Sequence, residues 1–413
     1  MSFDCVVVGG GAAGMMAAIE CKKNNLDVAI VEHTAKLGTK ILKTGNGKCN
    51  FSNTNMCREM YQNDNPDYAM RVIDRFNVDD TVDFFAGLGV LKKEKNGYLY
   101  PRSETASSVA AALIGYIEKL QIPVYYETAV KDFLKKNNGY ELKLTGTVNS
   151  SVNTRNVILA CGSNASPSSG SDGSGYKLAK KLGINVIKPL PALTALESDK
   201  KNMKAASGVR ACGKVSIIAA GTCIAQDMGE IQFTDYGISG IPVFQVSRHA
   251  VKALDAGIDV YAELDMAEEI DADILCGIIR NVAAERPDEQ VCDALSGIFN
   301  KKLAMMICKD AGIDLNMHMS EIDDDICHRI TAKVKSLRYH ITGFKDNNYA
   351  QISQGGIDLR ELDDNLELRN NPGIFCVGEL VDVDGKCGGY NLQWAWSSAV
   401  VAARTVCTRC ENI

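Results

Sequence analysis

The chain opens with Asp4-Cys5-Val6-Val7-Val8-Gly9-Gly10-Gly11-Ala12-Ala13-Gly14, and this stretch decides the fold. The apolar residues before Gly9 predict a buried strand, and Met15 to Lys23 predict a helix. Gly9, Gly11 and Gly14 form the pattern G-x-G-x-x-G between them. A strand, a glycine turn and a helix in this order are typical of a dinucleotide-binding βαβ unit.

The residues after this helix complete the unit. Val28 to Val31 is a second buried strand, and Glu32 follows it, 18 residues past Gly14. In such a unit the first glycine allows a tight turn, the second leaves room for a pyrophosphate and the third lets helix and strand pack closely. The helix N-terminus attracts phosphate, and the carboxylate can accept hydrogen bonds from ribose hydroxyls. We therefore predict that an ADP moiety binds at Gly9, Gly11, Ala12, Ala13, Gly14 and Glu32.

Composition and charge exclude several classes of protein. The 413 residues are 46% hydrophobic, carry a net charge of −6 and have their lysines and arginines spread along the chain, which predicts no nucleic-acid surface. The chain has neither a basic leader nor a run of 18 apolar residues, so we expect no signal peptide and no membrane span. Its length predicts two or three domains.

The cysteines indicate a reducing compartment. Fifteen of them are irregularly spaced and lie mostly in apolar runs, which suits reduced thiols in the cytoplasm and not a disulfide framework. Cys407 and Cys410 form a single C-x-x-C, and the second pair that a zinc site needs is missing. We therefore predict a cytoplasmic protein without a metal site.

A second strand–glycine–helix unit stands near the end of the chain. Residues 373–377 form a buried strand, Gly378 and Glu379 follow it, and Gly388 and Gly389 precede a helix that begins near Asn391. Two such units suit a long cofactor, FAD, with ADP on the first unit and the flavin on the last. Glu379 would accept a hydrogen bond from ribityl hydroxyls. The Gly388-Gly389 turn and the helix after it would approach the flavin pyrimidine, where negative charge develops on reduction.

The predicted fold is therefore α/β. Residues 1–189 and 345–413 form a glutathione-reductase-type FAD-binding Rossmann-like domain, interrupted by two inserts. Residues 190–265 are short strands broken by glycine and aspartate, which predicts a β-rich, barrel-like substrate domain, and residues 266–344 predict a helical domain. An insertion at a loop is physically ordinary because it costs little closure entropy.

Several longer blocks carry a specific resemblance. The most specific are Thr44-Gly-Asn-Gly-Lys-Cys-Asn50 and Gly388-Gly-Tyr-Asn-Leu-Gln393, and others are 157–183, 233–240 and 353–356. With these blocks the chain resembles, over essentially its full length, the HI-type FAD-binding flavoproteins, which include BaiN-like bile-acid reductases and aminoacetone-oxidase-like proteins.

The resemblance implies a set of cofactor-binding residues. They are Lys40, Thr44, Gly45, Cys49 and Asn50 in a loop that lines the flavin, Val130, whose backbone meets adenine, Ala160 and Gly162 at the end of a strand, and Gly378, Glu379, Asp384, Gly388, Gly389, Asn391 and Leu392 at the flavin end.

Two residues depart from the family pattern. Cys161 replaces the usual threonine, a change that we expect to be tolerated. Asp235 replaces a histidine that is common in the block at 233–240, so the substrate or the proton donor of this protein can differ from those of its relatives.

The predicted activity is that of an FAD-dependent oxidoreductase. NADH or NADPH would reduce the flavin, and the flavin would reduce a small organic acceptor such as an α,β-unsaturated ketone of the steroid type. Leu178 stands where the third glycine would follow Gly173 and Gly175, so we expect the nicotinamide to visit the flavin only transiently. Tyr236 and Tyr390 are the candidate proton or oxyanion donors, although each equally fits a packed ring whose hydroxyl is bonded elsewhere.

Two alternatives remain open. One is an oxidase of a small amine or aminoketone that produces hydrogen peroxide, and the other is a flavin-dependent RNA-modifying protein. The apolar run 237–244 fits a hydrophobic ligand, and it equally fits a core strand. The sequence gives no oligomeric state.

Overall fold

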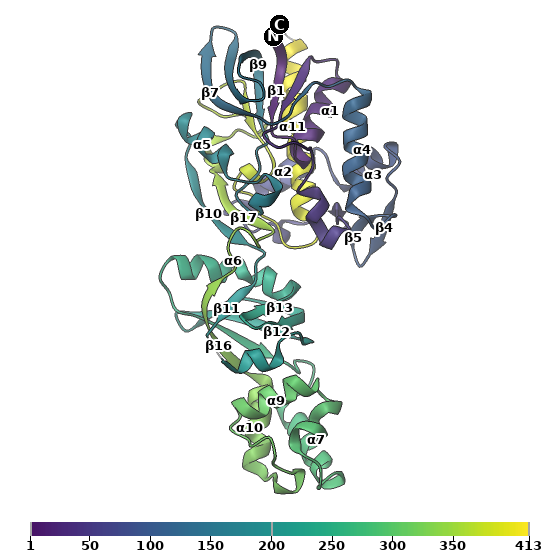
Figure 1. Ribbon diagram of the computed structural model, residues 1–413, viewed down its shortest axis with the longest axis vertical. Coiled ribbons are helices and arrows are strands. Elements are labelled where there is room, and N and C mark those ends of the chain that lie inside the picture. Colours follow the sequence, from purple (N-terminus) through teal and green to yellow (C-terminus); the bar gives the residue numbers. More distant parts are fainter. Residues whose placement is uncertain (1, 200, 412–413) are drawn as a thin grey trace. The chain divides into compact units, whose positions relative to one another are not determined.

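A computed structural model describes residues 2–199 and 201–411 of the chain. Figure 1 traces its helices and strands. Contacts between residues divide it into two compact units. The first consists of Met1–Leu190 and Gln351–Ile413, and the second is Pro191–Ala350.

The N-terminal βαβ unit forms the centre of a seven-stranded sheet, whose main path is β6-β2-β1-β9-β8-β7. Strand β1 (Ser2–Val8) pairs in parallel with β2 (Val28–Val31) on one side and with β9 (Ser151–Leu159) on the other. Central parallel strands are covered on both faces, and for that reason residues 5–8 and 28–31 read as continuous apolar runs.

Strand β9 pairs with strands from both ends of the sequence, β1 and β18. Its first residues pair antiparallel with β8 (Gly139–Gly146), and β8 pairs with β7 (Thr128–Lys136). Its last residues pair in parallel with β18 (Ile374–Cys376), so that Phe375 lies opposite Ile158. The predicted C-terminal strand therefore enters the same sheet as the N-terminal unit. The segments that carry the two glycine turns follow the carboxyl ends of β1 and β18, which both pair in parallel with β9.

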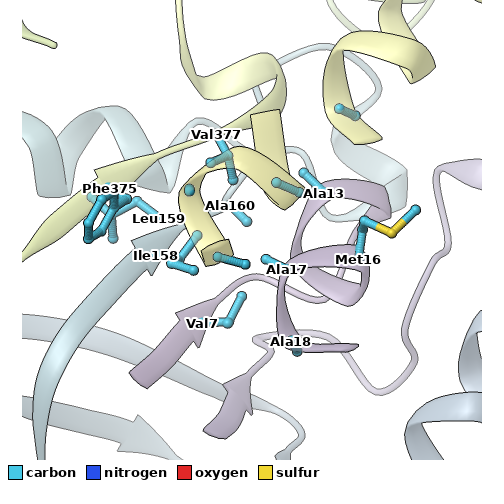
Figure 2. Packing of buried hydrophobic residues seen from close by; sticks show 14 of the residues in the cluster. Val7, Ala13, Met16, Ala17, Ala18, Ile158, Leu159, Ala160, Phe375 and Val377 are labelled. Atoms are coloured by element: carbon cyan, nitrogen blue, oxygen red, sulfur yellow. The ribbon is translucent and has the colours of Figure 1, made fainter. Parts of the chain in front are cut away.

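Two helices, α1 (Ala12–Lys23) and α11 (Tyr390–Glu411), pack closely together in this unit. The buried residues of α1 include Ala13, Gly14, Ala17 and Ala18, and small side chains allow such close packing. Figure 2 shows the core beneath α1, where side chains from the helix, from β1 and β9 and from the β18 segment gather: Val7, Ala13, Ala17, Ile158, Leu159, Ala160, Phe375 and Val377.

The remaining elements of the first unit surround this core. The helices are α2 (Pro66–Ile73), α3 (Val78–Gly87), α4 (Ala106–Lys119) and α5 (Ser174–Lys181). A small three-stranded sheet contains β3 (Ser52–Asn53), β4 (Lys92–Lys95) and β5 (Tyr98–Pro101), with β5 in the middle. The short strand β6 (Val124–Tyr125) extends the main sheet, and β10 (Val186–Ala192) pairs with β17 (Ile352–Ile357).

The second unit contains a closed barrel in the order β11-β14-β13-β12-β15-β16. Its strands are β11 (Leu196–Ser198), β12 (Arg210–Ala219), β13 (Thr222–Phe233), β14 (Gly237–Ser239), β15 (Val260–Asp265) and β16 (Leu337–Phe344). Its helices are α6 (Ile241–Asp255), α7 (Ala272–Glu285), α8 (Val291–Ala294), α9 (Lys301–Asp310) and α10 (Asp324–Lys335).

This barrel differs from the predicted division at residue 265. The helices end at Lys335, and β16 then returns to pair with β15 and β11, which closes the barrel. Barrel and helices also share one hydrophobic core. Residues 190–265 and 266–344 therefore do not form two domains with separate hydrophobic cores. The strand that closes the barrel of the first segment, β16, lies at the end of the second segment.

No helix within residues 2–199 and 201–411 is both long enough and apolar enough to cross a bilayer.

Candidate cofactor site

The first glycine turn, between β1 and α1, leaves no room for side chains at two positions. A Cβ atom at Gly14 would lie 1.8 Å from the carbonyl oxygen of Gly9, and one at Gly9 would lie 2.5 Å from that of Ala160. Gly9 also has a φ of +106°, which favours glycine. The predicted roles of these two glycines thus have a steric basis in the backbone.

Gly11 faces open space. Among the described residues no atom would lie within 4 Å of a Cβ atom placed there. Gly11 is also the N-cap of α1 and supplies no capping side chain, so the amide groups of Ala12 and Ala13 stand at an uncapped helix start. An uncapped N-terminus beside open space suits a phosphate group.

Glu32 lies directly after β2 and is 6% exposed. Its Oε2 accepts a hydrogen bond from the Gly10 amide at 2.6 Å, and its Oε1 accepts bonds from the amide and hydroxyl groups of Thr34 at 2.7 and 2.8 Å. His33 Nδ1 lies 3.2 Å from Oε1. A carboxylate offers about four acceptor positions. The chain therefore holds Glu32 against the glycine turn and leaves it capacity for a ribose hydroxyl.

Three further predicted positions lie beside this region. Val130 is buried in the edge strand β7, whose first residue, Thr128, donates its amide to the Glu32 carbonyl at 3.0 Å. Ala160 donates its amide to the Val8 carbonyl at 2.8 Å, and Gly162 follows with a φ of +70°.

The loop from Thr44 to Asn50 contains four residues with positive φ angles: Gly45 (54°), Asn46 (53°), Gly47 (84°) and Cys49 (54°). The Cys49 amide donates to the Thr44 carbonyl at 3.1 Å and closes the loop. Burial raises the pKa of the Cys49 thiol to about 11, so this thiol is neutral at physiological pH. Strained backbone of this kind is concentrated at functional sites.

This loop meets the second glycine turn at Asn50. A Cβ atom at Gly389 would lie 2.4 Å from the Ser52 carbonyl oxygen and 2.8 Å from Asn50 Oδ1. Asn53 donates its side-chain amide to the Gly388 carbonyl at 2.8 Å. Asn50 Oδ1 is buried, and it has no hydrogen-bond partner within the part of the chain that the structure describes.

A third contact joins the two halves of the site. The ammonium group of Lys40 lies 2.5 Å from Glu379 Oε2, and Ser163 Oγ lies 3.4 Å from the same oxygen. Gly378 has a φ of +65°, and a Cβ atom there would lie 3.0 Å from that of Ala13 at the start of α1. Residues that are far apart in the sequence therefore meet at the ends of β1, β9 and β18.

The last predicted residues lie close in sequence to the second turn. Asn391 accepts the Gly385 amide at 2.8 Å and donates to the Gly385 carbonyl at 2.9 Å. The carbonyl of Asp384, which is buried, accepts the Gln62 amide at 2.9 Å. Leu392 is partly buried in the first turn of α11.

Sequence reasoning missed Gln393 as a site residue. Its fully buried side chain accepts a hydrogen bond from Ser52 at 2.6 Å and donates to Thr81 at 2.9 Å and Ser397 at 3.0 Å. This network ties α11 to β3, which lies next to Asn50 and against Gly389. A glutamine that directly precedes the apolar run Trp394-Ala395-Trp396 of a buried helix is the signal that could have revealed it, since a buried amide needs partners.

The two candidate catalytic tyrosines belong to different units. Tyr390 is the first residue of α11 and is buried, with its ring 6.3 Å from that of Tyr61 in an edge-on arrangement. Burial raises the pKa of Tyr390 to about 12. Tyr236 lies in the second unit between β13 and β14, where the Lys345 ammonium lies 4.0 Å from its ring centre. Asp235 beside it is exposed.

The residues present fit FAD. Gly11 leaves open space before an uncapped helix, Glu32 keeps acceptor capacity, and an unpaired carboxamide oxygen is buried beside the second turn. Phosphate, ribose and a ring with a polar edge are the groups that such positions accept.

Fold and site together define an FAD-binding Rossmann-fold oxidoreductase. The chain belongs to the HI0933-like Rossmann-domain family, whose model matches residues 3–405. It is 36% identical over 406 residues to the 3-dehydro-bile acid delta(4,6)-reductase of Clostridium scindens, covering 98% of each chain. It is 26% identical to the ribosomal RNA dihydrouridine synthase of Escherichia coli, covering 97% of each. The predictions of family, fold class and enzyme class are thereby confirmed.

Two solved structures share the fold. The 3-ketosteroid delta1-dehydrogenase of Sterolibacterium denitrificans aligns with a TM-score of 0.51 at 11% identity, covering 99% of this chain and 100% of that chain. A quinol-fumarate reductase aligns with a TM-score of 0.52 at 14% identity, covering 100% of this chain and 72% of that chain.

Proposed function

We propose that this protein is an NAD(P)H-driven reductase that uses FAD to saturate an α,β-unsaturated ketone of the steroid or bile-acid type. The observation that carries the proposal is the 36% identity, across 98% of both chains, to a 3-dehydro-bile acid delta(4,6)-reductase. Bound FAD supplies hydride chemistry at N5. The glycine turn at Gly9–Gly14 and Glu32 would hold its ADP half, and the 44–50 loop and the Gly388-Gly389 turn would hold the flavin.

Reduction of an enone needs two further contributions from the protein. A hydride arrives at the β-carbon, a proton must reach the α-carbon, and negative charge on the carbonyl oxygen must be stabilised. Tyr390 is the first candidate for the proton donor, because a tyrosine phenol is protonated at physiological pH. Its position directly after Gly389 also supports this role. Tyr236 is the second candidate donor.

The experiment is anaerobic rapid mixing of the purified holoprotein with NADH and with NADPH, followed by addition of a 3-keto-4-ene steroid. Bleaching of the flavin absorbance by either nucleotide, and its return on adding the steroid, are the expected results. Absence of bleaching would overturn the nicotinamide donor. Bleaching without any return on adding the enone would overturn the acceptor.

Two variants sharpen this test. Tyr390→Phe should be reduced by the nicotinamide at the wild-type rate and transfer to the enone at least about tenfold more slowly, because general acid catalysis contributes at least that much. Tyr236→Phe is the parallel variant in the second unit. Unchanged transfer in both variants would remove the tyrosines as donors.

An RNA substrate is the second candidate, and the relatives named ribosomal RNA dihydrouridine synthase favour it. The uracil C5=C6 bond is conjugated with a carbonyl group, so its reduction resembles that of an enone. The net charge of −6 and the dispersed cations favour the small molecule. A uridine-containing RNA fragment therefore serves as a further acceptor in the same experiment, and we expect it to leave the flavin reduced.

The oxidase alternative has its own readout. Reduction of the flavin by a small amine or aminoketone, followed by formation of hydrogen peroxide in air, would replace the reductase proposal. We expect neither.

A further inference from the structure

Strands β4 and β5 form a hairpin (Figure 1) that carries aromatic and basic side chains on one face. Asn96 and Gly97 connect the two strands with φ angles of 53° and 85°, which a tight two-residue turn requires. This turn fixes the register, so that Lys95 lies opposite Tyr98 and shares its face. Residues two apart on a strand point to the same face, so Tyr100 lies on this face as well.

The two tyrosines form a row of aromatic rings. Both are half-buried, whereas Leu99 between them is fully buried on the opposite face of the strand. The ring centres of Tyr98 and Tyr100 lie 6.5 Å apart, and the ring planes differ by only 20°. A half-exposed row of nearly parallel rings is a surface on which an apolar ring system can pack.

This tyrosine row adjoins both segments that we assign to the flavin. A Cβ atom at Gly388 would lie 3.0 Å from Tyr98 Cε1 and 3.1 Å from Tyr390 Cε2. At the other end, a Cβ atom at Gly45 would lie 3.9 Å from Tyr100 Cε1. A ligand on the row would therefore lie beside the cofactor site and the candidate proton donor Tyr390.

Two lysines share this face, and they differ in their ion pairs. Lys93, which lies opposite Tyr100, pairs with the carboxylate of Glu104. Lys95 is exposed and forms no ion pair with any residue within 2–199 and 201–411. An unpaired ammonium group beside a row of aromatic rings complements a ligand that has an apolar ring system and an anionic group.

We propose that Tyr98 and Tyr100 pack against the ring system of a steroid acid and that Lys95 binds its carboxylate. This proposal rests on the proposed function, and it defines the acceptor further as an anionic steroid. The occupant follows from position, because the tyrosine row is continuous with the cofactor site at which the acceptor must react. The three residues determine specificity, and none of them transfers a hydride or a proton.

The test measures binding to the oxidised holoprotein, in which the acceptor is not consumed because no electron donor is present. A 3-keto-4-ene steroid with a side-chain carboxylate and its methyl ester are compared by equilibrium dialysis. The wild type should bind the acid about three- to fivefold more tightly than the ester, the contribution of a partly exposed ion pair. Lys95→Met should bind both equally. Equal affinities in the wild type would overturn the anionic ligand, a result that needs no variant to fold.

A second pair of variants tests the aromatic row. Tyr100→Leu should bind acid and ester about three- to tenfold more weakly and keep the preference for the acid, whereas Tyr100→Phe retains the ring and should bind as the wild type does. Wild-type affinity in Tyr100→Leu would overturn the packing role. So would loss of bound FAD from this variant, because the ring would then belong to the cofactor site.

Helix α4 offers matched controls. Tyr116 is a half-buried tyrosine whose ring centre lies 5.7 Å from Lys119 Nζ, so the same two residue types stand together there. Tyr116→Leu and Lys119→Met should bind acid and ester as the wild type does. An equal loss in these variants would show that the effects at Tyr100 and Lys95 are not specific and would overturn the proposal.

The outcomes separate this proposal from the proposed function. Steroid binding with the expected preferences, but without bleaching of the flavin by NADH or NADPH, supports the tyrosine row and removes the nicotinamide donor. Turnover of the enone with equal affinity for acid and ester loses only the anionic ligand. A uridine-containing RNA fragment that displaces the steroid acid from the wild type, and that Tyr100→Leu does not bind, would assign the row to a base and overturn the steroid.

Discussion

The two glycine turns of the first unit are constrained by different neighbours. In the first turn, Gly14 packs against Gly9, and Gly9 packs against Ala160 on the adjacent strand. In the second turn, Gly389 packs against Ser52, a residue from the other end of the chain. The first turn is thus a nearly self-contained motif, whereas the second depends on a distant segment.

The two turns also differ in how much free space lies beside their glycines. Gly11 faces space free of described atoms, whereas Cβ atoms at Gly385, Gly388 and Gly389 would all lie within 3.0 Å of a neighbour. A ligand can therefore approach the backbone of the first turn directly. At the second turn the glycines bring other groups together, above all Asn50 and the start of α11.

The largest effect is expected from Gly14→Ala. The added Cβ meets the Gly9 carbonyl oxygen, a backbone atom that cannot move without disturbing β1. We expect the free energy of unfolding to fall by about 3 kcal/mol, the upper end for overpacking, and FAD binding to be lost. Urea denaturation and flavin titration measure the two. Wild-type stability in this variant would contradict the close packing of α1 on β1.

Gly11→Ala tests the open space in the same turn. Its φ of −78° suits alanine and no described atom is in the way, so the free energy of unfolding should change by less than about 1 kcal/mol. The methyl group would occupy the space assigned to the pyrophosphate, and FAD affinity should fall about 100-fold, or about 2.7 kcal/mol. Tight FAD binding by a stable variant would place the pyrophosphate elsewhere.

Gly389→Ala tests the second turn. A φ of +93° and the Ser52 carbonyl oxygen both oppose a side chain there, so about 2 kcal/mol of stability should be lost. Since the first turn is untouched, ADP should bind as in the wild type while FAD binds about tenfold more weakly, a difference of about 1.4 kcal/mol. Calorimetry with both ligands separates these effects. Equal losses for ADP and FAD would show that the turns are not independent.

Lys40→Met should have a smaller effect. The side chains of Lys40 and Glu379 are 23% and 17% exposed, and loss of such a pair should change the free energy of unfolding by about 1 kcal/mol or less. FAD affinity should fall only a few-fold. Lys43→Met is the control. This exposed lysine donates to the Ser168 hydroxyl at 2.6 Å, so its loss should change stability by a similarly small amount and leave FAD affinity unchanged.

The last effect depends on pH and is absent at physiological pH. The pKa of Tyr390 is about 12 in the folded protein, above the usual value near 10. Between these values the unfolded chain loses the proton while the folded chain keeps it, so stability from this group is complete below pH 10 and declines above it. The slope belonging to Tyr390 is at most about 1.4 kcal/mol per pH unit. Tyr390→Phe should flatten stability against pH only above pH 10. A difference between the two proteins in the slope of stability against pH at pH 7–9 would contradict the assigned pKa.

Local sequence patterns were enough to predict the N-terminal unit. The strand, glycines, helix, second strand and Glu32 all lie within about thirty residues, and their constraints are local: strand burial, helix period and backbone clashes between residues a few positions apart. The same local rules identified the second glycine turn and the interruption of the domain.

The contacts between distant segments became visible in the folded chain alone. The ion pair of Lys40 with Glu379, the network of Gln393 and the position of Asn50 against Gly389 join the two ends of the chain. The barrel likewise closes only when β16 returns after the helices. Such contacts depend on which side chains the completed sheet and barrel bring together, and no period or spacing in the chain encodes that choice.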